Sequence, residues 1–211
     1  MIWFTRLLAL GLVLVMTGIL TGCPFSTDPG GGGGGGGETP VFSPRTSVTN
    51  LLENLKTAYS ERVPAEYESL LALDFSFVFS DLDQADPDVP SEDLTREDEV
   101  RIHESMFDAT LVQSLTLDFT YDIGSLEVDE VFTTENDTIW TLYLTNVNLY
   151  LYGGTPQHPN EPEGYELTNG VEQLWFRENG WTHSNGDPIW TIVRWKEHNF
   201  AAAMAAAQPV P

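Results

Sequence analysis

The residue whose type and position most clearly predict chemistry is Cys23, the only cysteine in the chain. A cysteine thiolate is a strong nucleophile that can be alkylated or acylated. Cys23 follows a short start that carries Arg6 and then an uncharged, mainly apolar stretch over residues 7–20. That stretch is shorter than the ~20 residues of a membrane-spanning helix and is typical of a secretory signal peptide. Residues 1–22 are therefore predicted to be a targeting segment.

The run Leu20-Thr21-Gly22-Cys23 resembles the lipobox of bacterial lipoproteins, in which a large apolar residue stands three places before the cysteine. The resemblance implies cleavage between Gly22 and Cys23 and attachment of acyl chains to Cys23, which would anchor the chain stably in a membrane. The alternative is a membrane helix over residues 2–20 with an incidental cysteine behind it. Pro24 follows the cysteine, where Asp would mark inner-membrane retention in Gram-negative bacteria. In such a cell the outer membrane is the expected location, on either its periplasmic or its surface side.

Residues 23–43 are predicted to be a flexible tether, because they contain an unbroken run of glycines from Gly30 to Gly37. Such a run cannot bury apolar surface and has great backbone freedom. A phosphate-binding loop would need a following Lys and Ser/Thr or a strand–turn–helix frame, and neither is present. The folded domain is expected over residues 44–200, with an Ala/Pro-rich tail over residues 201–211.

The composition predicts an acidic, folded domain without nucleic-acid partners. The chain has 32 acidic and 9 basic residues and a formal net charge of −23, which repels nucleic acid and anionic headgroups. Aromatic residues make up 11% of the chain, enough for a substantial core. With a single cysteine, the domain has no internal disulfide and depends on that core.

An acidic segment raises the question of a calcium site. Asp81, Asp83 and Glu92 would fall at positions 1, 3 and 12 of an EF-hand loop, but position 6, which requires glycine, is Asp86. A looser calcium site through Asp81, Asp83, Asp86 and Asp88 stays open beside the simpler interpretation of a solvated charge run. The four histidines have no ligand spacing, so we predict no metal and no cofactor.

Three helices are predicted in the first half of the domain. Apolar residues recur at three- and four-residue spacing over residues 47–62, with Ser47 or Thr46 as the N-cap. A short helix is expected over residues 65–71, and a third begins at Ser91 or Thr95. The inner face of the third helix is expected to carry Val100, Ile102, His103, Met106 and Phe107.

Strands dominate the rest of the domain. Residues 74–79 and 115–123 alternate apolar and polar side chains, as strands buried on one face do. Residues 139–152 are almost wholly strand-forming, and residues 171–177 and 189–196 form a predicted hairpin. The pattern predicts the α+β class, with N-terminal helices packed on a strongly curved antiparallel sheet.

Two stretches resemble nuclear transport factor 2-like domains, the cone-shaped fold also called SnoaL-like or cystatin-like. They are the opening Leu51-Leu52-Glu53-Asn54-Leu55-Lys56-Thr57-Ala58-Tyr59, continued by Tyr67, Leu70-Leu71 and Asp74-Phe75, and the closing Ile189-Trp190-Thr191-Ile192-Val193-Arg194-Trp195. The resemblance spans residues 48–197 and implies a pocket between the helices and the sheet. Its pocket-lining residues would be Tyr59, Tyr67, Phe75, Phe77, Met106, Phe107, Phe119 and Trp140.

The resemblance also implies candidate acid–base residues, because isomerases, dehydratases and cyclases of this superfamily place an Asp, His or Tyr in the pocket. The candidates here are Asp74, His103, Tyr121 and, on its polar strand face, Asp118. Each also has a structural interpretation: a turn residue at the mouth of the first strand for Asp74, a satisfied core histidine for His103, core packing for Tyr121 and a solvated strand face for Asp118. No convergent acid–base pair is evident.

Three functions follow as hypotheses. The first is a non-catalytic lipoprotein of the cell envelope that binds a small apolar ligand or an envelope protein. The second is an isomerase- or dehydratase-type enzyme using Asp74 or His103, and the third is a scaffold that dimerises through its sheet. Trp175, Trp181, Trp190 and Trp195 either pack the core or form an outward aromatic patch for sugars or a partner.

Overall fold

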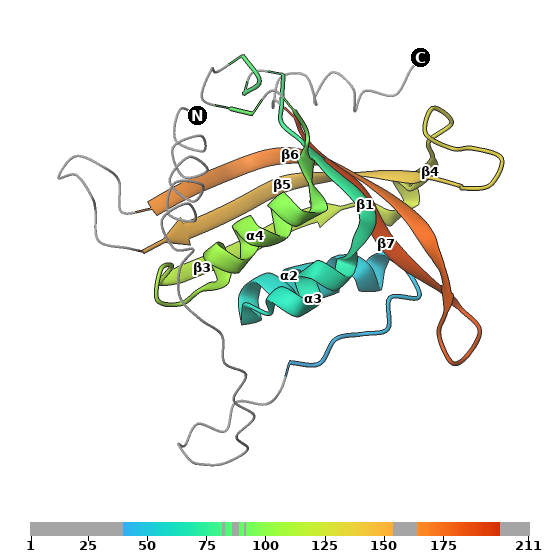
Figure 1. The fold of residues 1–211 in the computed structure, drawn as a ribbon, viewed down its shortest axis with the longest axis horizontal. Helices are drawn as coiled ribbons and strands as arrows, with labels where there is room; N and C mark the ends of the chain where they lie inside the picture. Colours follow the sequence, from blue (N-terminus) through green and yellow to red (C-terminus); the bar gives the residue numbers. More distant parts are fainter. Residues whose placement is uncertain (1–39, 82, 86–88, 91, 154–163, 199–211) are drawn as a thin grey trace, which may run out of the picture.

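The computed structural model describes residues 40–81, 83–85, 89–90, 92–153 and 164–198. The helices in this part are α2 (Val48–Glu61), α3 (Pro64–Leu70) and α4 (Arg96–Phe107), with the 3-10 turn η1 (Ile123–Ser125). The strands are β1 (Leu71–Val78), β2 (Leu94–Thr95), β3 (Ser114–Tyr121), β4 (Glu127–Val128), β5 (Trp140–Tyr152), β6 (Gly164–Thr182) and β7 (Pro188–His198) (Figure 1). The predicted signal peptide with Gly22 and Cys23, the glycine run and the tail lie outside these ranges and stay predictions.

All the strands belong to one sheet, in the order β2-β1-β7-β6-β5-β3, with β4 paired to β5. The long strands β3, β5, β6 and β7 pair antiparallel, as predicted. The pairing of β1 with β7 is parallel, which the prediction of an antiparallel sheet missed. A parallel pair needs a long connection, and here most of the domain lies between the two strands.

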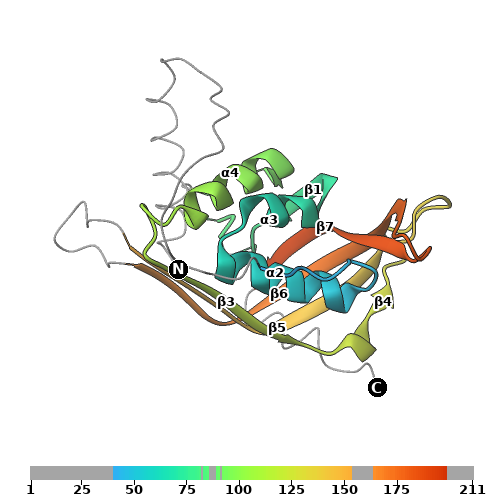
Figure 2. The same ribbon diagram turned by 90° about the horizontal axis from the view of Figure 1, so that it is seen from below.

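The three helices lie on one face of the sheet, which curves around them (Figure 2). The predicted face of α2 is buried from Val48 to Tyr59, and the Ser47 side chain accepts a hydrogen bond from the Asn50 N–H as the N-cap. Pro64 stands at the start of α3, where its missing N–H removes no helical hydrogen bond. The α+β class with helices on a curved sheet is confirmed. Within the described ranges, no helix is long and apolar enough to cross a membrane.

Irregular positions bend the two longest strands. Asn146 in β5 and Asn169 in β6 have φ values of 50° and 54°, and the register between β5 and β6 shifts beside Val147. Asparagine tolerates this left-handed conformation better than most residues, and such bulges increase the bend of a strand. Because β6 is bent in this way, its first residues pair with β5 and its last residues pair with β7. The strand extends beyond the predicted residues 171–177 at both ends.

The four tryptophans of β6 and β7 lie in different environments. Trp195 belongs to the core beneath the helices, and Trp190 packs partly buried against it, with its ring near that of Trp140. Trp175 is also buried but lies outside that core and packs edge-on against Phe132. Trp181 is 73% exposed. The four side chains therefore do not form one outward aromatic patch.

Candidate functional site

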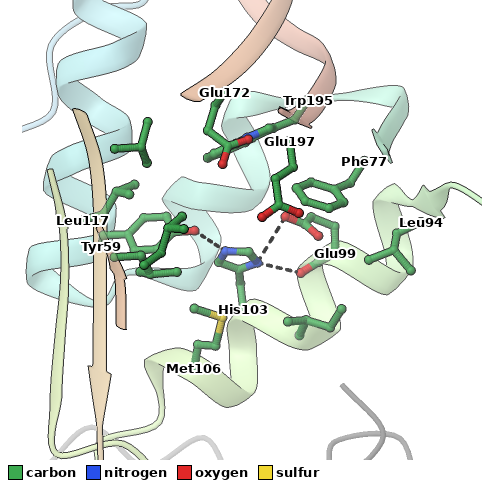
Figure 3. Close-up of a pocket in the computed structure, with 14 residues that line it drawn as sticks. Tyr59, Phe77, Leu94, Glu99, His103, Met106, Leu117, Glu172, Trp195 and Glu197 are labelled. Carbon is green, nitrogen blue, oxygen red and sulfur yellow. Dashed lines mark hydrogen bonds and ion pairs between the residues drawn. The ribbon is translucent and has the colours of Figure 1, made fainter. Parts of the chain in front are cut away.

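A cavity of about 70 Å³ lies between α4 and the sheet, and its wall is mainly apolar (Figure 3). The polar residues of the wall include Glu99 and His103 from α4, Glu172 from β6 and Glu197 from β7. Tyr59 closes the side toward α2, and Trp195 and Phe77 line the side toward the β7–β1 pair. Side chains from widely separated parts of the chain therefore face one partly open space.

Helix α4 places its polar residues in the cavity wall because its start is fixed and its buried face is regular. Thr95 and Asp98 form a capping box in which each side chain accepts a hydrogen bond from the other residue's backbone N–H. Glu99, His103 and Phe107 follow at four-residue spacing, so they share one helical face, and all three are buried. The apolar face of α4 thus carries a carboxyl and an imidazole.

Both ring nitrogens of His103 have protein partners. Nδ1 lies 2.9 Å from the backbone carbonyl oxygen of Glu99, which can only accept, so Nδ1 carries the proton. The Tyr59 hydroxyl then donates to Nε2. Burial lowers the pKa of His103 to about 4, and the ring stacks on that of Tyr67 with centroids 3.9 Å apart. His103 is therefore a neutral histidine of fixed tautomer.

The Glu99 carboxyl lies beside this imidazole. Its Oε1 accepts a 2.8 Å hydrogen bond from the Tyr67 hydroxyl and lies 3.5 Å from His103 Nδ1. Burial raises the pKa of Glu99 to about 7, against the opposing effect of the Tyr67 hydrogen bond. Because His103 is neutral above about pH 4, the Glu99–His103 contact is not an ion pair at neutral pH.

Two further carboxyl groups face the cavity from neighbouring strands. The Trp195 indole N–H donates to Glu172 Oε2 at 2.9 Å, and burial, followed by the charge of Glu197, raises the pKa of Glu172 well above its ordinary value. Burial and the nearby Asp83 raise the pKa of Glu197 to about 8. The Oε2 atom of Glu197 is buried and has no hydrogen-bond partner among the described residues.

The predicted pocket residues separate into two groups. His103, Tyr59, Phe77 and Met106 line the cavity. The others do not line it: Tyr67, Phe75, Phe107 and Phe119 lie within the packed core, and Trp140 packs partly buried against that core. These side chains fill the space between the helices and the sheet, which is why the cavity is small.

The remaining acid–base candidates lie away from the cavity. Asp74 is exposed in the middle of β1 rather than at its mouth, and it forms an ion pair with Arg177 at 2.5 Å. The Tyr121 hydroxyl donates to Glu53 at an exposed position, 3.1 Å away. Asp118 forms an ion pair with Lys56 at 3.2 Å. Each of these polar groups has a partner near the surface, and none of them lines the cavity.

The predicted calcium candidates are only partly described. Asp81 lies 3.6 Å from the Lys196 ammonium, and the Asp83 carboxylate accepts from the Ser80 hydroxyl. Asp86 and Asp88 lie outside the described residues. No set of three or more His, Cys, Asp or Glu side chains in the described part of the chain is grouped to hold a metal ion.

Sequence reasoning did not select Glu99, Glu172 or Glu197. Two signals were present. Glu99 lies four residues before His103 on the same helical face, and Glu172 lies in a strand segment whose neighbours are buried on both faces, from Val171 to Phe176. A glutamate within an apolar run is a reason to expect a buried carboxyl, since Glu is rarely buried without a partner.

No protein-family model matches the chain, and no curated protein matches it. Solved structures with a similar fold include an NTF2-like protein of unknown function in nutrient uptake from Rhodospirillum rubrum (17% identity, 72% of this chain and 97% of that chain, TM-score 0.42). Others are an uncharacterized protein with a cystatin-like fold from Caulobacter vibrioides (13%, 75% and 92%, TM-score 0.41) and ActVI-ORFA from Streptomyces coelicolor (13%, 71% and 92%, TM-score 0.41). At these identities the similarity concerns the fold alone.

Proposed function

We propose that this chain is a lipid-anchored protein of the cell envelope whose domain binds a small molecule in the cavity between α4 and the sheet. The observation that carries the binding role is the cavity itself: a partly open, mainly apolar space with a few convergent polar groups. Small-molecule sites share this lining of apolar walls with a few polar groups, and most of them are larger than this cavity. An engineered apolar cavity of about 150 Å³ holds benzene, so this smaller cavity suits a ligand smaller than benzene.

Binding without conversion fits the state of His103. Its Nδ1 proton is held by the Glu99 carbonyl and its Nε2 by the Tyr59 hydroxyl, so neither nitrogen is available to a ligand while these bonds persist. Its pKa of about 4 also makes it a weak base. A general base works best when its pKa is near the working pH.

Glu99 favours a second candidate function, proton transfer of the isomerase or dehydratase kind. Its pKa of about 7 suits a group that both accepts and donates a proton at neutral pH, and it lines the cavity. The test is deuterium uptake at the α-carbons of butanone in D₂O, followed by proton NMR. Exchange that is accelerated by the protein and lost in Glu99→Gln supports catalysis. Exchange at the buffer rate contradicts this second function.

The anchoring proposal rests on the lipobox resemblance and is tested in a bacterial host. The full chain is expressed in cells fed an alkyne-tagged fatty acid, and the tag is detected after fractionation. Tagged protein in the membrane fraction, lost in Cys23→Ser but retained in Ser26→Ala, supports lipidation at Cys23. Untagged protein in the soluble fraction contradicts it.

A further inference from the structure

We propose that the cavity selects a small organic ammonium ion, such as a protonated primary amine with a short alkyl chain. This inference rests on the proposed binding function and names its ligand class. The carboxyl groups of Glu99, Glu172 and Glu197 reach the cavity from α4, β6 and β7, and no Lys or Arg lines it within the described residues. Figure 3 shows these groups around the His103 ring.

In their ionised form the carboxyl groups that line the cavity only accept hydrogen bonds. Trp195 satisfies Glu172 Oε2 and Tyr67 satisfies Glu99 Oε1, but Glu197 Oε2 is buried without a partner in the described part of the chain. A buried acceptor without a donor is destabilising. An ammonium group carries three N–H donors and no acceptor, so it complements this wall where an alcohol supplies one donor and a carboxylate none.

The aromatic and apolar side chains of the wall also favour an alkylammonium ion. The rings of Tyr59, Phe77 and Trp195 line the cavity, with the Phe77 and Trp195 centroids 6.3 Å apart. Aromatic faces attract ammonium ions, most strongly where water is excluded. The remaining apolar wall suits a short alkyl chain, and the net charge of −23 draws cations toward the protein.

The charge balance of the cavity makes ammonium binding depend on pH. The groups that face these carboxyls are Asp98 and the neutral His103 on α4, Tyr59 on α2, Tyr67 on α3 and Asp83 after β1, and none brings a positive charge at neutral pH. Burial and mutual repulsion therefore raise the pKa values of the three carboxyls, to about 7 for Glu99 and about 8 for Glu197, so each is protonated more than an ordinary carboxyl at neutral pH. A bound ammonium ion favours the ionised form of the carboxyls. Its binding therefore releases protons, and its affinity increases as the pH rises.

The test compares n-butylamine with 1-butanol and butyrate, which have the same chain length and different head groups. Each is titrated at pH 8.5 into the full chain in detergent, with the tryptophan indoles ¹⁵N-labelled. The Trp195 indole reports on the cavity because it donates to Glu172, and Trp195→Phe assigns its signal. We expect n-butylamine to shift this signal at a concentration at least tenfold below that of 1-butanol, while butyrate leaves it unmoved.

Two further measurements test the ammonium selectivity, one on the unchanged protein and one on a variant. Between pH 6 and pH 8.5 the affinity for n-butylamine is expected to rise roughly tenfold or more, because a group of raised pKa must lose its proton. Glu197→Gln, which keeps the side-chain shape, is expected to weaken n-butylamine roughly tenfold and to leave 1-butanol unchanged.

The outcomes separate this inference from the binding function on which it rests. A Trp195 signal that responds to 1-butanol as well as to n-butylamine, without pH dependence, overturns the ammonium selectivity and leaves small-molecule binding in place. A response to butyrate alone also overturns the selectivity. A signal that none of the three molecules moves overturns both proposals.

Discussion

Tyr59 and His103 are 44 residues apart in the chain, and inside the core the Tyr59 hydroxyl donates a hydrogen bond to the Nε2 atom of the His103 ring. The bond joins α2 to α4 and fixes the imidazole against the cavity. It is buried, so its loss leaves Nε2 without a partner. The stability of the domain and the state of the site therefore depend on the same contact.

The first prediction concerns Tyr59→Phe. It removes only the hydroxyl and strands a buried acceptor, so the free energy of unfolding should fall by about 1–3 kcal/mol. The His103 tautomer should not change, because Nδ1 still donates to the Glu99 carbonyl. Chemical denaturation measures the first effect, and the ¹⁵N shifts of the ring measure the second. Tyr121→Phe, at an exposed hydroxyl, is the control and should change stability by less than about 0.5 kcal/mol.

The second prediction is a fall in stability above neutral pH. The folded-state pKa values of Glu99 and Glu197 are raised from 4.5 to about 7 and about 8, so their contribution is full below 4.5 and is lost as the pH rises through 7 and 8. Glu172 acts in the same direction. The pKa of His103 is lowered from 6.5 to about 4, so its contribution is lost only as the pH falls below 6.5.

Above pH 6.5 the carboxyl effects therefore stand alone. Between pH 6.5 and 8.5 the free energy of unfolding should fall on the order of 2 kcal/mol, measured by urea denaturation at constant ionic strength. A stability that stays level or rises over this interval would show that the three carboxyls are ionised in the folded domain.

Glu197→Gln gives the third prediction. The amide is neutral at every pH, so the variant should equal the wild type near pH 5.5 and exceed its free energy of unfolding by about 1 kcal/mol or more at pH 8.5. Glu178→Gln on the exposed side of β6 is the matched control, with no pH-dependent difference expected. Thermal unfolding at both pH values makes the comparison, and equal gains in both variants would trace the effect to net charge instead.

The sequence was sufficient for the elements whose residues alternate between water and core. The periodic face of α2 and the strict alternation of β3 from Leu115 to Phe119 matched the observed burial. The cavity was harder to predict, because its polar wall depends on which strands become neighbours. Glu172 and Glu197 pair across β6 and β7 in a register that hairpin residues alone do not specify.

Asp74 illustrates a different kind of error. A local pattern suggested that the residue stands at the start of a strand, which its position in the sheet contradicts. The residue was expected at the mouth of a strand starting near it, but β1 begins at Leu71, directly after α3. Asp74 therefore lies inside the strand on its exposed side. Its partner, Arg177, lies 103 residues away in β6, so no local sequence pattern could show the pairing.

The fourth prediction uses this ion pair to distinguish ligand binding at the surface from ligand binding in the cavity. Arg177 contacts both Asp74 and, at 2.9 Å, Asp137, so Asp74→Asn leaves it with one carboxylate partner. Asp74 is exposed and Arg177 is partly buried, and the loss of the pair should lower the free energy of unfolding by at most about 1 kcal/mol. The affinity for n-butylamine should stay within twofold of the wild type, because Asp74 does not line the cavity. Measuring both quantities on one sample is decisive: a large loss of binding with little loss of stability would place the ligand at Asp74 and away from Glu99, Glu172 and Glu197.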